Sequence, residues 1–193
     1  YDRNLNIPGE ELAGSHSATE FVAWYNGHPD FAEHQFDLNQ ESVAVVGVGN
    51  VAMDVARILC KTHAELAVTD MADYALDALK NSQVKNVYIL GRRGPAQAAF
   101  TPPEIKEMGE FEDADVTVPQ DEAALDTDSA AALEAGGDKN AQKNVTFIEE
   151  YASREISGKS RLLTIRFLVS PTELVGEDGR VTGIKLVKNK LVQ

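Results

Sequence analysis

The sequence lacks the features that mark secreted and membrane proteins. It contains one cysteine, so an internal disulfide is impossible; this is typical of a reducing compartment, and we expect a cytoplasmic protein. No apolar run approaches the roughly 20 residues that a membrane-spanning helix needs, so no membrane insertion is expected. The first residues lack the apolar core of a secretory signal peptide. The four histidines show no metal-ligand spacing, and the sequence predicts no metal site.

Basic residues are scarce relative to acidic ones. The chain has 18 lysines and arginines against 31 aspartates and glutamates, which gives a formal net charge of −13. This charge argues against nucleic acid and anionic membrane surfaces as partners. An anionic ligand would have to be attracted by local groups, and the adjacent pair Arg92 and Arg93 is therefore conspicuous.

The composition is that of an ordinary globular chain. With 193 residues, 43% hydrophobic and 25% charged, it suits one domain with or without appendages. It contains no internal repeat, no P-loop and no G-x-S-x-G motif. It does not begin with Met, and residues 188–193 form no closing element, so we expect a piece of a longer protein.

Apolar periodicity predicts an alternation of strands and helices along the first two thirds of the chain. Runs rich in β-branched residues predict strands at 43–47, 86–90 and 115–118. Helical spacing of apolar residues, a capping box beginning at Ser17 and two consecutive prolines predict helices. We place these helices at 17–26, 50–60, 71–80 and 102–108. Residues 61–70 are expected to form a connection.

The last third is less regular. Residues 120–143 are poor in bulky apolar side chains and predict a mobile or weakly helical surface insertion. Residues 144–152 suit either a helix or a strand. Three further strands are predicted, with a hairpin turn at 176–179, and they are placed at 162–170, 172–176 and 181–187. The predicted fold is α/β, a Rossmann-like parallel sheet with flanking helices and a small antiparallel β-meander.

The first strand leads into a glycine-rich turn. Gly47-Val-Gly-Asn-Val-Ala52 fits the G-x-G-x-x-A form of the dinucleotide fingerprint. Gly47 allows the tight turn, Gly49 lets the backbone approach a pyrophosphate, and Ala52 keeps the helix close to the strand. A helix that begins near Asn50 directs free N–H groups at the phosphates. The alternative is a purely structural turn.

The second strand leads into Gly91-Arg92-Arg93-Gly94. An NAD site would have a carboxylate here for the ribose hydroxyls, and two guanidinium groups stand in its place. Arginine is suited to bidentate phosphate binding, so the pattern favours NADP(H) over NAD(H). The alternative is a pair of exposed arginines in an ion-pair network. The distance between the motifs exceeds the usual ~20 residues, so either 61–82 is an insertion or the motifs are unrelated.

Two carboxylates lie three residues apart on the predicted helix 102–108. Glu104 and Glu107 therefore share one face, where a carboxylate could hold the nicotinamide carboxamide or ribose. From the residues alone, a solvated face is the favoured interpretation. Cys60 lies on the apolar face of the helix 50–60 and is expected to fill the core.

Several segments of the chain together resemble a known family. It is similar to the NADP-binding domain of ferredoxin–NADP reductases of the adrenodoxin-reductase type, among the glutathione-reductase-like two-dinucleotide flavoproteins. The matching segments are 6–10, 21–26, 49–57, 91–101 with Glu104, and 167–171. That family also has a long segment between the two motifs. Position 48, valine here, is often polar in the family.

The resemblance implies a domain organisation and a pyrophosphate site. The NADP domain of the family is inserted into an FAD domain that is split across both chain ends. Residues 1–14 would then be a connector from that FAD domain, 15–187 the NADP-binding domain, and 188–193 a connector back. The pyrophosphate would be lined by Asn50, Val51 and Ala52.

The resemblance also implies roles for four charged residues. Arg92 and Arg93 would hold the 2′-phosphate. Glu104 would contact the nicotinamide end. Glu107 would lie near the hydride-transfer centre and is the catalytic candidate.

The implied activity is electron transfer. NADPH would pass a hydride to FAD, and single electrons would then pass to a ferredoxin or similar iron–sulfur protein. The partners would be that ferredoxin and the protein's own FAD domain, and the chain alone should bind nucleotide without turnover. Three alternatives stay open: another flavoprotein such as the glutamate synthase small subunit, a non-catalytic nucleotide-binding module, and a structural domain with a degenerate site.

Overall fold

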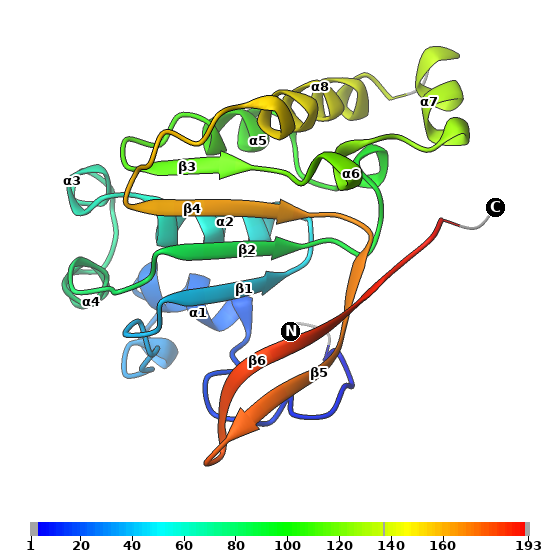
Figure 1. Ribbon diagram of the computed structural model, residues 1–193. Coiled ribbons are helices and arrows are strands. Elements are labelled where there is room, and N and C mark those ends of the chain that lie inside the picture. The colour runs from blue at the N-terminus through cyan, green and yellow to red at the C-terminus, as the bar shows by residue number, and fades with distance from the viewer. Residues whose placement is uncertain (1–3, 137, 192–193) are drawn as a thin grey trace.

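The computed structural model describes residues 4–136 and 138–191. Its centre is a sheet of four parallel strands in the order β1-β2-β4-β3 (Figure 1). A separate antiparallel pair, β5 and β6, extends away from this sheet. The strands are β1 Ser42–Val46, β2 Asn86–Leu90, β3 Ala114–Thr117, β4 Arg161–Arg166, β5 Val169–Glu177 and β6 Arg180–Lys188.

Helices occupy the connections between the strands. The α-helices are α1 Ala18–Tyr25, α2 Asn50–Cys60, α3 His63–Leu66, α4 Asp73–Lys80, α5 Pro102–Met108, α6 Gln120–Ala123, α7 Thr127–Glu134 and α8 Lys139–Ser153. Two short 3-10 helices, η1 Pro29–Phe31 and η2 Pro95–Gln97, complete the set in the described residues. Helix α2 crosses behind the sheet in Figure 1, and α8 runs beside β3 at the edge.

The core lies on one face of the sheet. Val87, Ile89, Leu163 and Ile165 are fully buried, and the alternation of side chains along a strand puts them on the same face. They join apolar side chains of α1, α2, α5 and α8 in one cluster. Within that cluster Cys60 is fully buried, as the sequence predicts.

The predicted alternation of strands and helices is confirmed. Strands β1 and β2 and helices α2 and α5 lie within one residue of the predicted bounds. The expected connection 61–70 contains a further short helix, α3. The hydroxyl of Thr62 accepts a bond from the N–H of Glu65, whose carboxylate in turn accepts one from the N–H of Thr62. This capping box is sufficient to start a single turn.

The antiparallel part is smaller than predicted. Residues 162–170 are not one strand of a meander, because Arg161–Arg166 pairs in parallel with both β2 and β3. The chain turns at Leu168, which adopts a φ of 55°, and then begins β5. The antiparallel unit is therefore the β5–β6 hairpin alone.

The described residues of the segment 120–143 are largely helical, which agrees with the helical alternative of the prediction. It contains α6, α7 and the start of α8, and α8 continues through the ambiguous residues 144–152. Asp126 caps α7 by accepting from the N–H groups of Asp128 and Ser129. The segment also contributes to the interior, since Glu122 and Ala123 are buried.

Both expected connectors lie against the β5–β6 hairpin. The N–H of Leu174 donates to the carbonyl of Pro8, and Ala13 pairs with Arg180 as an isolated bridge. Strand β6 ends at Lys188, where the carboxyl-terminal connector is expected to begin. Residues 1–3 and 192–193 of these connectors lie outside the described residues. The domain boundaries stay predictions.

Candidate nucleotide-binding site

The first glycine-rich turn joins β1 to α2. Gly47 adopts a φ of 129°, a conformation that a side chain would strain, and its N–H donates to the carbonyl of Leu90 at 2.9 Å. Gly49 is different, because its φ is −110° and a Cβ built there would meet no atom within 4 Å. The packing of the described chain therefore gives no reason for glycine at position 49. A ligand that approaches the backbone would give one.

The N-terminus of α2 presents donors at this turn. Gly49 is its N-cap and offers no side-chain hydrogen bond. The first N–H groups of a helix have no partner within the helix, and these are the groups of Asn50, Val51 and Ala52. Val51 is exposed, whereas Ala52 is buried against the turn, 3.9 Å from the position of a Cβ on Gly47. Free N–H groups and the positive end of an 11-residue helix suit an anion.

The second motif lies against the first. Strands β1 and β2 pair in parallel, so both turns follow the same edge of the sheet. A Cβ on Gly91 would lie 2.6 Å from Cγ1 of Val48 and 3.2 Å from the carbonyl oxygen of Arg166. The N–H of Ala99 also donates to the carbonyl of Val48. The two motifs thus lie against each other despite their separation in the sequence.

The guanidinium groups of Arg92 and Arg93 are exposed. Every other arginine within residues 4–136 and 138–191 donates to a carboxylate or to a backbone carbonyl, as its hydrogen bonds and ion pairs show. Arg92 and Arg93 have no such side-chain contact with the described residues. The alternative of an ion-pair network is therefore not seen in this part of the chain. In a chain of net charge −13, two adjacent cations without a side-chain partner among the described residues are a candidate site for an anion.

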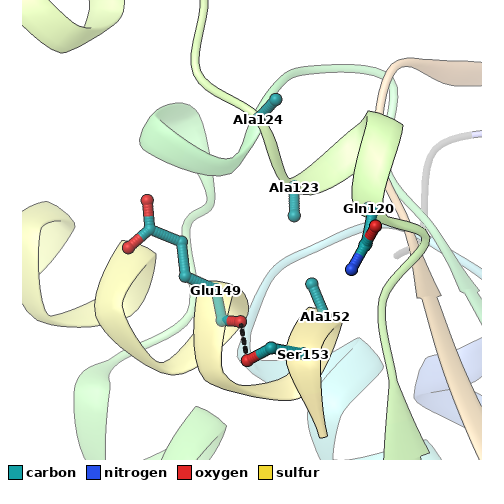
Figure 2. A pocket seen from close by; sticks show the side chains of 6 residues that line it. All are labelled: Gln120, Ala123, Ala124, Glu149, Ala152 and Ser153. Atoms are coloured by element: carbon teal, nitrogen blue, oxygen red, sulfur yellow. Dashed lines mark hydrogen bonds between the residues drawn. The ribbon is translucent and has the colours of Figure 1, made fainter.

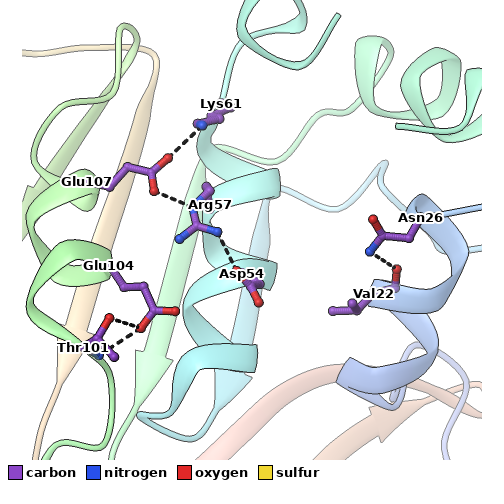
Figure 3. Close-up of polar contacts among 8 residues, drawn as sticks. All are labelled: Val22, Asn26, Asp54, Arg57, Lys61, Thr101, Glu104 and Glu107. Carbon is purple, nitrogen blue, oxygen red and sulfur yellow. Dashed lines mark hydrogen bonds and ion pairs between the residues drawn. The ribbon is translucent and has the colours of Figure 1, made fainter. Parts of the chain in front are cut away.

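Glu104 caps the helix that carries it. Its Oε2 accepts from the N–H of Thr101 at 2.9 Å and from the Thr101 hydroxyl at 2.8 Å (Figure 3). Both bonds use the same oxygen, and Oε1 accepts no hydrogen bond from the described residues. The carboxylate is half-buried at the start of α5.

Glu107 lies one turn further along α5 and faces α2. Its Oε2 lies 2.9 Å from Nε of Arg57, and its Oε1 accepts from Nζ of Lys61 at 2.8 Å. Arg57 in turn pairs with Asp54, so four charged side chains bridge the two helices (Figure 3). Sequence reasoning did not find this network. The i, i+3 and i, i+4 spacing of Asp54, Arg57 and Lys61 was its only local signal.

A hollow of about 270 Å³ lies elsewhere, between α6 and α8 (Figure 2). Its lining consists of Gln120, Ala123, Ala124, Glu149, Ala152 and Ser153. The carboxylate of Glu149 points away from Gln120, and Ser153 donates to the carbonyl of Glu149 (Figure 2). None of these residues is a predicted site residue.

Within residues 4–136 and 138–191, no group of three or more His, Cys, Asp or Glu side chains is placed to hold a metal ion. The helices of the same residues are too short or too polar to cross a bilayer.

Comparison with known proteins agrees with the geometry. The fold and the paired turns are those of a dinucleotide-binding α/β unit. No protein-family model matches the chain. The chain is 44% identical over 191 residues to the NADPH-ferredoxin reductase FprA of Mycobacterium leprae, covering 99% of this chain and 41% of that protein. It is 39% identical over 199 residues to the mitochondrial NADPH:adrenodoxin oxidoreductase of Arabidopsis thaliana, covering 98% of this chain and 41% of that protein.

A solved structure supports the same assignment. Mycobacterium tuberculosis FprA in complex with NADPH matches with a TM-score of 0.91 and 45% identity, covering 100% of this chain and 41% of that chain. The chain is homologous along its length to reductases of the adrenodoxin-reductase type, which confirms the resemblance seen in the sequence. It spans about two fifths of their length, as those coverages of 41% show.

Proposed function

We propose that this chain is the NADP(H)-binding part of a flavin-dependent ferredoxin–NADP reductase. The observation that carries the proposal is that two groups lie at one edge of the sheet: the N-terminus of α2, which has no side-chain cap, and the guanidinium groups of Arg92 and Arg93, which have no partner among the described residues. A pyrophosphate is common to the dinucleotide cofactors, and the 2′-phosphate distinguishes NADP(H) from NAD(H). The similarity to an FprA structure solved with NADPH supports the same ligand.

The chain's own residues would bind and orient the nucleotide. The N–H groups of Asn50, Val51 and Ala52 would hold the pyrophosphate, and the open backbone at Gly49 would let it approach. Arg92 and Arg93 would bind the 2′-phosphate as bidentate donors and select NADP(H) over NAD(H). FAD, held by the rest of the protein, would supply the redox chemistry that passes electrons on to a ferredoxin.

The two carboxylates would serve the nicotinamide end. Glu104 keeps Oε1 for the carboxamide or ribose while Oε2 caps α5. Glu107 has both oxygens paired with cations, so it would act near the hydride-transfer centre through its position and its ion pairs. Its place as the catalytic candidate is part of this proposal.

The partners would be the protein's own FAD domain and an iron–sulfur protein. The relatives named above are ferredoxin and adrenodoxin reductases, which favours this activity over that of a glutamate synthase subunit. A cytoplasmic location stays a prediction.

The test is an assay of the full-length protein that contains this chain. With FAD present, it should reduce a [2Fe–2S] ferredoxin with NADPH and much more slowly with NADH. The 193-residue chain alone should bind nucleotide and leave NADPH unoxidised. Reduction of ferredoxin with NADH as efficient as with NADPH, or none with either, would contradict the proposal.

A further inference from the structure

The loop that carries Arg92 and Arg93 is held by residues far along the chain. The N–H of Gly91 donates to the carbonyl of Arg166 at 2.8 Å, and the N–H of Val169 donates to the carbonyl of Gly91 at 2.9 Å. The N–H of Leu168 donates to the carbonyl of Arg93 at 3.1 Å. The turn between β4 and β5 therefore fixes the loop on both sides of Arg92.

Arg92 itself is held by a side chain. Nδ2 of Asn189 donates to the carbonyl of Arg92 at 2.9 Å and to the hydroxyl of Ser170 at 2.8 Å. The N–H of Asn189 donates to the carbonyl of Leu168 at 2.7 Å. Asn189 is half-buried and follows directly on β6. From its position directly after the end of β6, this one amide thus ties the loop to Ser170, near the start of β5.

We propose that Asn189 is a positioning residue for recognition of the 2′-phosphate, an inference that rests on the proposed function. The guanidinium groups of Arg92 and Arg93 have no side-chain partner in the described residues, so their placement depends on their backbone. Bidentate phosphate binding needs an accurately placed pair of donors. The carbonyl of Arg93 accepts a backbone N–H, that of Leu168, whereas the carbonyl of Arg92 accepts none from the described chain. Asn189 holds the backbone of Arg92 at this second carbonyl.

This assignment places a determinant of selectivity outside the predicted NADP domain. Asn189 lies in 188–193, the segment expected to lead back to the FAD domain. Leu191 of the same segment reaches Gly94, where a Cβ would lie 3.4 Å from its Cδ1. The return segment therefore covers the arginine loop at two points.

The experiment is calorimetric titration of the full chain with NADPH and with NADH. Asn189→Ala should weaken NADPH binding about threefold to tenfold, the worth of a lost hydrogen bond, and leave NADH binding unchanged. Partial loss of the fold would weaken the binding of both nucleotides equally. The ratio of the NADPH and NADH dissociation constants, called the NADPH/NADH ratio below, is therefore the decisive readout. Asn81→Ala is the matched control: it also removes an amide that donates to a backbone carbonyl, here that of Asp77 at 2.9 Å, and should change neither value.

Further variants separate the possible failures. If Asn189→Ala does not fold, Ser170→Ala carries the test, with a smaller loss confined to NADPH. The inference is overturned if the NADPH/NADH ratio is unchanged in the folded Asn189→Ala variant, or in Ser170→Ala if Asn189→Ala does not fold. The proposed function would still stand if Arg92→Ala/Arg93→Ala abolished the preference for NADPH. Absence of any preference in the unmodified chain overturns the 2′-phosphate site, and with it this inference.

Discussion

A Cβ on Gly91 would lie 2.6 Å from Cγ1 of Val48, so the arginine loop and the glycine-rich turn touch at a point where only glycine fits. This contact fixes the distance between the two proposed phosphate sites. Gly91→Ala should therefore destabilise the chain by about 1–3 kcal/mol, the usual cost of overpacking, and weaken NADPH binding.

Removing the opposing methyl group of Val48 should restore the stability lost in Gly91→Ala. In the double variant Gly91→Ala/Val48→Ala the clash with Cγ1 is absent, and most of the stability should return in urea unfolding. If the single and double variants were equally unstable, the contact between the motifs would not be the cause.

Alanine substitution should have different effects at the two glycines of the first turn: at Gly47 it should mainly lower stability, and at Gly49 it should mainly weaken nucleotide binding. Gly47 has a φ of 129°, so Gly47→Ala should cost about 1 kcal/mol or more of unfolding free energy. Gly49 has open space around it and an extended backbone, so Gly49→Ala should cost only the small difference between glycine and alanine as N-cap and should weaken nucleotide binding. Thermal unfolding and calorimetry measure the two effects separately. Undiminished nucleotide binding by Gly49→Ala would remove the pyrophosphate from this turn.

Glu122 and Arg166 form a bidentate pair beside the arginine loop. Glu122 is 5% exposed, and it also accepts from the N–H of Phe167 at 3.0 Å. Its hydrogen bonds raise the pKa of Arg166 above the ordinary value of a guanidinium group. Glu122→Ala should cost about 1–3 kcal/mol, because it leaves a partly buried guanidinium and an N–H unpaired.

The matched control for Glu122 is the exposed pair Glu150 and Arg154. Their side chains are 53% and 35% exposed and lie one helical turn apart on α8. Glu150→Ala should change the unfolding free energy by less than about 0.5 kcal/mol. Equal costs for the two variants, measured by urea unfolding, would show that burial does not set the worth of these pairs.

Cys60 should be unreactive in the folded chain. Burial raises the pKa of its thiol to about 12, so no thiolate forms near neutral pH. An aromatic disulfide reagent at pH 8 should react only after denaturant is added. Between pH 9.0 and about 12 the unfolded thiol loses its proton while the folded thiol keeps it, so this group's contribution to stability falls as pH rises. Rapid labelling without denaturant would contradict the buried position.

The sequence predicts the elements that have strong local signals. Strand β1, helix α2 and both glycine turns follow from a β-branched run, a regular apolar spacing and residues that suit a positive φ. The strand prediction failed at Leu168, because the chain turns there on a residue that carries no turn signal. The pairing of β4 inside the parallel sheet depends on distant strands, which no local pattern encodes.

The residues of the candidate site also fall into those that a local sequence pattern predicts and those that depend on distant packing. The positions of Gly49, Arg92 and Arg93 were predictable because each motif follows directly on a strand. The partners of Glu107 were not, since they depend on how α5 packs against α2. Asn189 gave no signal either, because it reaches the carbonyl of Arg92 across 97 residues.

The central claim, that Arg92 and Arg93 select NADP(H), is tested most directly by titrating the chain with NADPH and NADH before and after Arg92→Ala/Arg93→Ala. The account predicts a strong preference for NADPH that falls by roughly 100-fold in the double variant, the worth of two charged hydrogen bonds, with NADH binding little changed. Equal binding of NADPH and NADH by the unmodified chain would contradict it.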